Sequence, residues 1–153
     1  MNELNCRDCQ FIAVMIWKKI LVPLDGSKNS LRGLENAISI ARACHATITG
    51  ICILPIYPKN LVDIVIPFLF HPEMEAKKFL ANAKKRAAQK GILFKSKIIW
   101  GSPIGEIQEM INSIKFDLIV IGSRGNGSLK ELFLGSVSNA IVHKSKIPVM
   151  LVK

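Results

Sequence analysis

The residues best suited to chemistry lie in one glycine- and serine-rich stretch near the carboxyl end of the sequence. Residues 122–139 read Gly-Ser-Arg-Gly-Asn-Gly-Ser-Leu-Lys-Glu-Leu-Phe-Leu-Gly-Ser-Val-Ser-Asn, between a strand-like run at 116–121 and a helix-like segment at 136–144. Glycine lets a backbone approach a ligand closely or adopt a positive φ. The first N–H groups of a helix lack partners and attract anions. With a guanidinium at Arg124 and hydroxyls at Ser136 and Ser138, the pattern predicts a polyphosphate site.

Two common phosphate-binding patterns are missing from this sequence. It contains no Gly-Lys-Ser/Thr and no Gly-x-Gly-x-x-Gly, and the glycine loop follows a late strand rather than the first. A glycine-rich loop alone is weak evidence, because many such segments are only connections. A second candidate, Asp-Gly-Ser at 25–27, follows the first apolar run, and on its own it is typical of an ordinary turn.

The full spacing of the loop is more specific than its glycine content. Gly122-x-x-Gly125, nine residues, then Gly135-Ser136 resembles the ATP-binding signature of the universal stress protein family. Residues 19–30, Lys-Ile-Leu-Val-Pro-Leu-Asp-Gly-Ser-Lys-Asn-Ser, are similar to that family's first strand and following loop. The resemblance covers about residues 17–153. It implies a single-domain α/β sandwich, Rossmann-like and adenine-nucleotide alpha-hydrolase-like, with a five-stranded parallel sheet of order 3-2-1-4-5 and helices on both faces.

The same resemblance implies a ligand, ATP or AMP with Mg²⁺ or Mn²⁺, and a set of contacts. The glycine loop would line the ribose and phosphates, and the following helix N-terminus would hold the phosphates. Asp25 matches an aspartate that contacts the ribose, and a metal ion bridging the phosphates would lie near it. Two apolar residues would wall the adenine, Ile53 by its place late in the second strand. The implied site residues are Pro23, Asp25, Ile53, Gly122, Arg124, Gly125, Gly135, Ser136, Val137 and Ser138.

Strand-like and helix-like segments alternate along the chain, which predicts a parallel sheet with right-handed crossovers. The expected strands are 17–24, 46–54, 92–100, 116–121 and 147–152, and the expected helices are 28–44, 72–90, one opening at 103, and 136–144. The mixed pattern of 92–100, with Lys95 and Lys97, suits an edge strand. Core-facing stripes are expected on each helix, including Ile107 and Ile114 on the third. The implied strand order brings Asp25 and Gly122 to one crevice, where the winding reverses.

Composition indicates one globular domain with a strongly basic surface. A chain of 153 residues can bury roughly 68–70% of its unfolded surface. Half of the residues are hydrophobic, 21% are charged, and the formal net charge is +10. Such a charge suits nucleic acid, an anionic membrane or a nucleotide. The lysines cluster in the predicted helix 72–90 with few aromatics nearby, and no nucleic-acid motif is recognised, so nucleic acid is not expected as the main partner.

Residues 1–15 are expected to be an extension outside the domain, which would occupy 16–153. The apolar run 11–17 is too short to span a membrane and resembles no signal peptide, so we expect a cytoplasmic protein. Cys6-x-x-Cys9 could bind a metal or cycle its redox state, but no second ligand pair accompanies it. Cys44 and Cys52 fall in apolar stretches and are expected in the core.

We expect a binding module rather than an enzyme, with at most slow ATP hydrolysis. No Ser–His–Asp or Cys–His arrangement can be placed. Glu131 and His143 are the ionisable groups near the loop, and a solvated loop residue and a helix-end histidine explain them better. The resemblance implies a nucleotide-dependent stress-response or signalling protein that pairs through its last strand as a homodimer and signals to an unknown protein partner. The alternatives are a non-nucleotide interaction protein acting through the apolar segment 55–71, and a weak ATPase.

Overall fold

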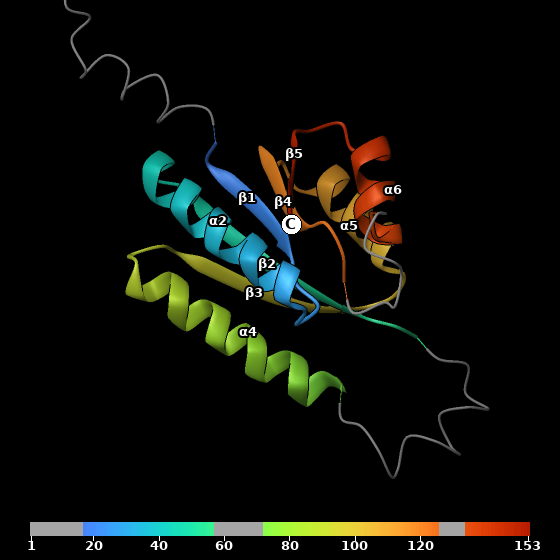
Figure 1. Ribbon diagram of the computed structural model, residues 1–153, viewed down its shortest axis with the longest axis horizontal. Coiled ribbons are helices and arrows are strands. Elements are labelled where there is room, and N and C mark those ends of the chain that lie inside the picture. The colour runs from blue at the N-terminus through green and yellow to red at the C-terminus, as the bar shows by residue number, and fades with distance from the viewer. Residues whose placement is uncertain (1–16, 57–71, 126–133) are drawn as a thin grey trace, which may run out of the picture.

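The protein folds as a parallel sheet covered by helices on both faces (Figure 1). The computed structural model describes residues 17–56, 72–125 and 134–153. The strands are β1 (Lys19–Pro23), β2 (Thr47–Leu54), β3 (Phe94–Trp100), β4 (Leu118–Gly122) and β5 (Val149–Val152). The helices are α2 (Lys28–Cys44), α4 (Pro72–Gln89), α5 (Pro103–Ser113) and α6 (Ser136–Lys144). The sheet order is β3-β2-β1-β4-β5 with every pair parallel, which confirms the predicted fold class.

Several strands begin later than the apolar runs predict, because local hydrogen bonds use the preceding residues. The Asp117 side chain accepts the backbone N–H of Lys18 at 2.8 Å, and β1 begins at the next residue, Lys19. Ile92 donates its N–H to Ala87 at the end of α4, which keeps it in the turn before β3. These side-chain and turn contacts compete with the sheet ladder for the same backbone groups.

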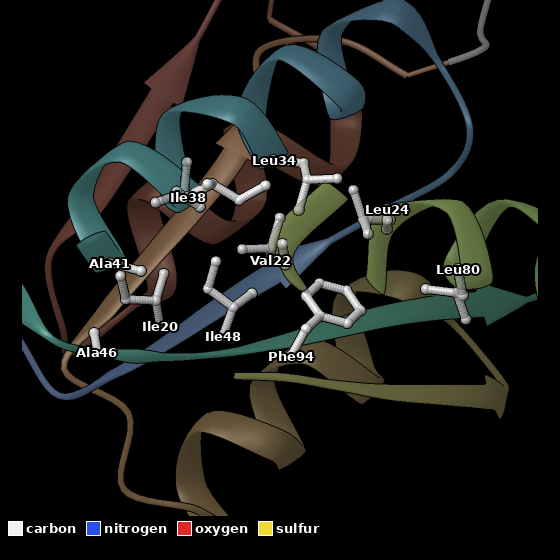
Figure 2. Close-up of a cluster of buried hydrophobic side chains, with 14 of the residues drawn as sticks. Ile20, Val22, Leu24, Leu34, Ile38, Ala41, Ala46, Ile48, Leu80 and Phe94 are labelled. Carbon is white, nitrogen blue, oxygen red and sulfur yellow. The ribbon is translucent and has the colours of Figure 1, made fainter. Parts of the chain in front are cut away.

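Helices α2 and α4 cover one face of the sheet, and the larger apolar cluster lies beneath them (Figures 1 and 2). Ser27 caps α2 by accepting the Ser30 N–H at 3.1 Å, and the helix ends at His45 in the left-handed conformation, φ 51°. Figure 2 shows the residues of α2 directed onto side chains of β1 and β2. The labelled residues are Ile20, Val22, Leu24, Leu34, Ile38, Ala41, Ala46, Ile48, Leu80 and Phe94.

Helices α5 and α6 cover the opposite face over a second apolar cluster. The cluster includes Leu21 and Ile51 from the sheet and Ile107 and Met110 from α5. The prediction that Ile114 belongs to the core stripe is wrong, since this residue is 39% exposed. The helix ends at Ser113, and Ile114 follows with φ −121° and ψ 128°, so its side chain leaves the helical stripe.

Some of the remaining expectations about structure are confirmed, and others concern residues outside the described ranges. β3 is an edge strand, and Cys44 and Cys52 are buried, as predicted. The expectations for residues 1–15, including Cys6 and Cys9, and for nearly all of the segment 55–71 concern residues that the structure does not describe. Across the described ranges, no helix combines the length and apolar character needed to cross a membrane.

Candidate functional site

A cavity of about 260 Å³ opens where β1 and β4 end, at the reversal of the sheet winding. All ten residues predicted from the sequence line it: Pro23, Asp25, Ile53, Gly122, Arg124, Gly125, Gly135, Ser136, Val137 and Ser138. Six further lining residues were not predicted: Leu24, Ser30, Ile51, Pro103, Ile107 and Ile121. The two motifs at opposite ends of the chain therefore meet at one site.

The end of β4 is built around a close approach of two backbones. A Cβ added to Gly122 would lie 2.7 Å from the carbonyl carbon of Asn29 and 2.8 Å from the nitrogen of Ser30. Only glycine leaves room for the first turn of α2 to lie directly against β4. The contact fixes the N-terminus of α2 beside the pocket, where Ser30 is one of the lining residues.

The Asp-Gly-Ser turn after β1 lies against the glycine loop after β4. The Asp25 carboxylate accepts the Ser27 N–H at 3.0 Å, and a Cβ on Gly125 would overlap Asp25 Oδ2. The Ser27 hydroxyl lies 3.5 Å from the carbonyl oxygen of Arg124, at the limit for a hydrogen bond. Asp25 is thus held at the pocket by its own turn and is in contact range of the loop.

The N-terminus of α6 closes the other side of the pocket, and its two serines have different environments. Gly135 caps the helix, and its N–H donates to Ser123 O at 2.8 Å. Ser138 is 2% exposed, and its hydroxyl lies 2.7 Å from Ser123 O and 2.9 Å from Gly135 O. Ser136, by contrast, is exposed. Ser138 therefore fastens the helix to the loop, whereas Ser136 faces solvent at the pocket.

The glycines of the loop serve close contacts rather than unusual backbone angles. Among the described residues, the glycines with positive φ are Gly26 and Gly91, in the turns after β1 and α4. Gly135 has φ −62°, and a Cβ there would lie 3.3 Å from Arg124 Cα, tighter than an ordinary contact. Of the two explanations for the loop glycines, close approach is therefore the one that Gly122, Gly125 and Gly135 support; Gly127 lies outside the described residues.

An apolar wall faces the glycine loop across the pocket. Pro23, Ile51 and Ile53 come from the sheet, and Pro103 and Ile107 come from the start of α5. Side chains alternate between the two faces of a strand, so Ile51 lies on the same face as Ile53. This alternation is the sequence signal from which Ile51 could have been predicted as a lining residue. Pro103 and Ile107 carry no motif, and only the packing of α5 on the sheet brings them to the site.

Among the described residues that line the pocket, the charged groups are one guanidinium, Arg124, and one carboxylate, Asp25. Burial, and secondarily the charge of Asp25, raises the pKa of the Cys52 thiol on β2 from 9.0 to about 11. Within the described ranges, no group of three or more His, Cys, Asp or Glu residues could hold a metal ion. His143 is exposed in the last turn of α6, and Glu131 lies outside the described residues.

The arrangement suits a ligand with an apolar ring at one end and negative charge at the other. Proline and isoleucine side chains offer a flat apolar wall, and a helix N-terminus with adjacent glycines offers unpaired N–H groups. Arg124 supplies positive charge beside them.

Comparisons with known proteins agree with this architecture. The profile of the universal stress protein family matches residues 17–153. Universal stress protein YxiE of Bacillus subtilis is 34% identical over 148 residues, covering 90% of this chain and 100% of YxiE. The solved structure of universal stress protein UspA from Lactobacillus plantarum matches with a TM-score of 0.80 at 22% identity, covering 90% of this chain and 98% of that chain.

Two further solved structures of similar fold hold nucleotides. A universal stress protein in complex with cAMP matches with a TM-score of 0.70 at 24% identity, covering 90% of this chain and 98% of that chain. The universal stress protein from Archaeoglobus fulgidus in complex with dAMP matches with a TM-score of 0.68 at 22% identity, covering 91% and 100%. Because the family match extends over residues 17–153 and YxiE is matched over its full length, this chain belongs to the universal stress protein family.

Proposed function

We propose that this protein binds ATP or AMP and acts as a nucleotide-dependent stress-response or signalling module. The observation that carries the proposal is the pocket itself, in which an apolar wall faces a glycine loop and a helix N-terminus. An adenine ring needs the first feature and a phosphate chain needs the second. The related proteins that hold cAMP and dAMP add support, since both ligands contain an adenine, a sugar and a phosphate, the three portions expected here.

Each part of the nucleotide has a candidate partner in the pocket. Pro23, Ile51 and Ile53 would contact the adenine, and Asp25 with the glycine loop would contact the ribose. The N–H groups at the start of α6, with Gly135 and Ser136, would bind the phosphates. Ser138 has a different role in this proposal, because its buried hydroxyl is used by Ser123 O and Gly135 O.

The residues present also fit a Mg²⁺ or Mn²⁺ ion held mainly by the nucleotide. Such ions bind through one or two carboxylates together with substrate phosphates rather than in a full protein cage. Asp25 is the carboxylate that lines the pocket. The ion would supply neutralisation of the phosphate charge. The described ionisable groups of the lining are Asp25 and Arg124, and we expect at most slow hydrolysis.

Calorimetric titration of the purified protein with ATP and Mg²⁺ tests the proposal. Ser136→Ala removes one charge-assisted hydrogen bond, worth roughly 1.5–3 kcal/mol, and should weaken binding about ten- to a hundredfold. Gly135→Val should abolish binding, because its side chain would press on Arg124 and displace the loop. Asp25→Ala should weaken binding more with the metal ion than without it.

Ser39→Ala provides a matched control for the serine variant. Its hydroxyl lies on the exposed surface of α2 and donates to Glu35 O at 3.0 Å, away from the pocket. It should bind ATP as the wild type does. A wild-type protein that takes up no adenine nucleotide, or a Gly135→Val variant that binds normally, would place the ligand elsewhere.

We further propose that two copies pair through β5. In the parallel ladder, the carbonyls of Pro148 and Val152 accept N–H groups from Ile119 and Ser123, so residues 148, 150 and 152 direct their backbone groups toward β4. The N–H and C=O groups of Val149 and Leu151 therefore face the free edge of the sheet. An isologous contact between two such edges would satisfy them.

The mass in solution tests this pairing. Val149→Lys with Leu151→Glu should lower the mass to that of a monomer in light scattering, and the idea is wrong if the mass does not fall. Because both side chains also pack against the α5 and α6 cluster, Leu151→Pro is a second variant. It removes the N–H that faces the edge, a change that edge strands tolerate, and it should give the same monomer with less disturbance of the core.

A further inference from the structure

A second concavity, of about 300 Å³, lies on the α5 side of the sheet at the opposite ends of the strands. Its polar lining residues are Lys19, Thr47, Thr49, Lys95, Ser96 and Lys97, and its apolar lining residues are Met110, Ile114 and Phe116. We call this set the lysine groove. The polar residues come from the first halves of β1, β2 and β3, and the apolar ones come from the end of α5 and the connection to β4.

Strand alternation explains why these side chains gather on one face. Thr47 and Thr49 share a face of β2 with Ile51, which belongs to the α5 and α6 cluster. Lys95 and Lys97 likewise share a face of β3 with Ile99. Neighbouring strands are in register, with Thr49 beside Lys95 and Lys19 beside Thr47. The lysine groove is thus the part of this face that α5 does not cover.

No lysine of the lysine groove forms an ion pair with another residue of the described ranges. The three ion pairs in the described ranges involve Lys77, Lys78 and Arg86, and none of these residues lines the groove. Lys97 Nζ lies 4.0 Å from Met110 Sδ, a weak contact with a neutral atom. Three ammonium groups over one concave surface favour a negatively charged occupant.

Two carboxylates are adjacent in sequence to lining residues of the groove, Glu109 beside Met110 and Asp117 beside Phe116, and neither is among the ion pairs of the described ranges. Asp117, next to Phe116, accepts the N–H groups of Lys18 and Lys19 at 2.8 Å each. The lining residues that the structure describes contain no carboxylate. Positive charge therefore predominates among the described residues that line the groove.

The floor and the far wall of the lysine groove are apolar. Met110 and Phe116 are buried at its base, and Ile114 is 39% exposed at its rim. Lysine side chains add apolar stems beneath their charged ends. A bare inorganic anion would leave these carbon atoms in water, whereas an attached apolar group would cover them.

We propose that the lysine groove is a second binding site, for a small organic anion that carries its charge at one end of an apolar body. The anionic group would lie among Lys19, Lys95 and Lys97, with the threonine hydroxyls as additional donors. The apolar body would lie on Met110, Ile114 and Phe116. This site is separate from the pocket at the carboxyl ends of the strands and does not depend on nucleotide binding there.

Phenyl phosphate is the probe, titrated into the ¹⁵N-labelled full chain and followed by the backbone amide shifts. Saturable shifts are expected at Thr47, Thr49 and residues 95–97. Two matched ligands separate the contributions: inorganic phosphate has the charge without the ring, and phenol has the ring without the charge. Both should bind more weakly than phenyl phosphate. If neither inorganic phosphate nor phenol binds more weakly than phenyl phosphate, the proposed division of the lysine groove into a charged part and an apolar part is wrong.

A double variant tests the lysines. Lys95→Gln with Lys97→Gln should weaken phenyl phosphate about three- to thirtyfold, as expected for two exposed charge contacts. Lys84→Gln with Lys85→Gln, on the exposed side of α4, removes the same charge and should change the affinity by less than about twofold, since distant exposed charges are screened. Equal losses in both variants, or shifts confined to Gly122–Gly125 and Gly135–Ser138, would overturn the proposal.

Discussion

The carboxyl-end pocket and the lysine groove lie on the same face of the sheet and share three structural elements, but their lining residues differ in chemical type. Strands β1 and β2 and helix α5 contribute to both. At the carboxyl ends, β2 contributes Ile51 and Ile53, and at the amino end the same face of β2 contributes Thr47 and Thr49. The residues change from apolar to polar where α5 and α6 stop covering the sheet. A face that helices bury must be apolar, whereas an uncovered face can be polar.

The two sites also present positive charge by different means. The carboxyl-end pocket combines one arginine with backbone N–H groups held by close packing of glycines. The lysine groove uses flexible ammonium groups on an exposed sheet surface. Preorganised backbone donors lose little entropy on binding, whereas lysine side chains lose rotamer freedom. The comparison therefore predicts tighter and more selective binding at the carboxyl-end pocket.

The largest effect should come from the close approach at the end of β4. Gly122→Ala places a methyl group within 2.9 Å of three backbone atoms of Asn29 and Ser30, and it should lower the free energy of unfolding by more than about 3 kcal/mol. Urea denaturation measures the change. Gly105→Ala is the control, because it lies in α5, where an added Cβ would lie at an ordinary contact distance of 3.8 Å from Ser102 Cβ, and it should stabilise the protein by up to about 1 kcal/mol. If the two variants changed the free energy of unfolding equally, the close packing at Gly122 could not be the cause.

A matched pair on β2 tests the contrast between the two halves of the face. Ile51 is fully buried, so Ile51→Thr should cost about 2–4 kcal/mol through lost apolar contacts and a buried hydroxyl. Thr49, two residues earlier and half-buried, should tolerate Thr49→Val within about 0.5 kcal/mol. Thermal and urea unfolding of both variants gives the comparison. A costly Thr49→Val would show that the lysine groove is part of the tightly packed core.

The raised pKa of Cys52 makes part of the stability depend on alkaline pH. The folded state holds the thiol protonated to about pH 11, whereas the ordinary value is 9.0, so above pH 9 the folded state binds the extra proton. The contribution of the protonated Cys52 thiol to the free energy of unfolding is complete below pH 9 and is lost as the pH rises toward 11. At pH 10.5 the loss is about 2 kcal/mol. Urea unfolding at pH 8 and 10.5 should show this loss in the wild type and not in Cys52→Ala.

Asp25→Asn, measured in the same way, tests the secondary cause of the raised Cys52 pKa, which is the charge of Asp25. The variant should retain most of the pH dependence, which burial causes, and lose a smaller part. If Asp25→Asn removed all of it, the carboxylate rather than burial would dominate the thiol's environment.

The smallest predicted effect on stability separates the two serines of α6. Ser138→Ala removes the hydroxyl that donates to Ser123 O or Gly135 O, and it should cost about 1–2 kcal/mol of unfolding free energy. Ser136→Ala, at an exposed position, should change stability by less than about 0.5 kcal/mol while it weakens nucleotide binding. The reverse pattern would exchange the roles assigned to these residues.

Local patterns in the sequence were sufficient for the architecture and for the frame of the carboxyl-end pocket. Helical and strand periodicities located the elements, although β1 and β3 begin later than predicted because Asp117 and the end of α4 use the intervening backbone groups. The Asp-Gly-Ser turn and the glycine loop follow β1 and β4, and neighbouring parallel strands end at the same edge. This is why residues as far apart as Asp25 and Gly125 could be placed together.

The order of elements, the family resemblance and the two motifs of the pocket could therefore be predicted, since each depends on residues close together in the chain. The point at which α5 stops covering the sheet could not be predicted, because it depends on packing between distant segments. That limit places Ile107 in the carboxyl-end pocket, leaves Ile114 exposed and gathers Lys19, Thr47 and Lys95 in the lysine groove. Alternation along a strand assigns a side chain to a face, but packing between distant segments determines what covers that face.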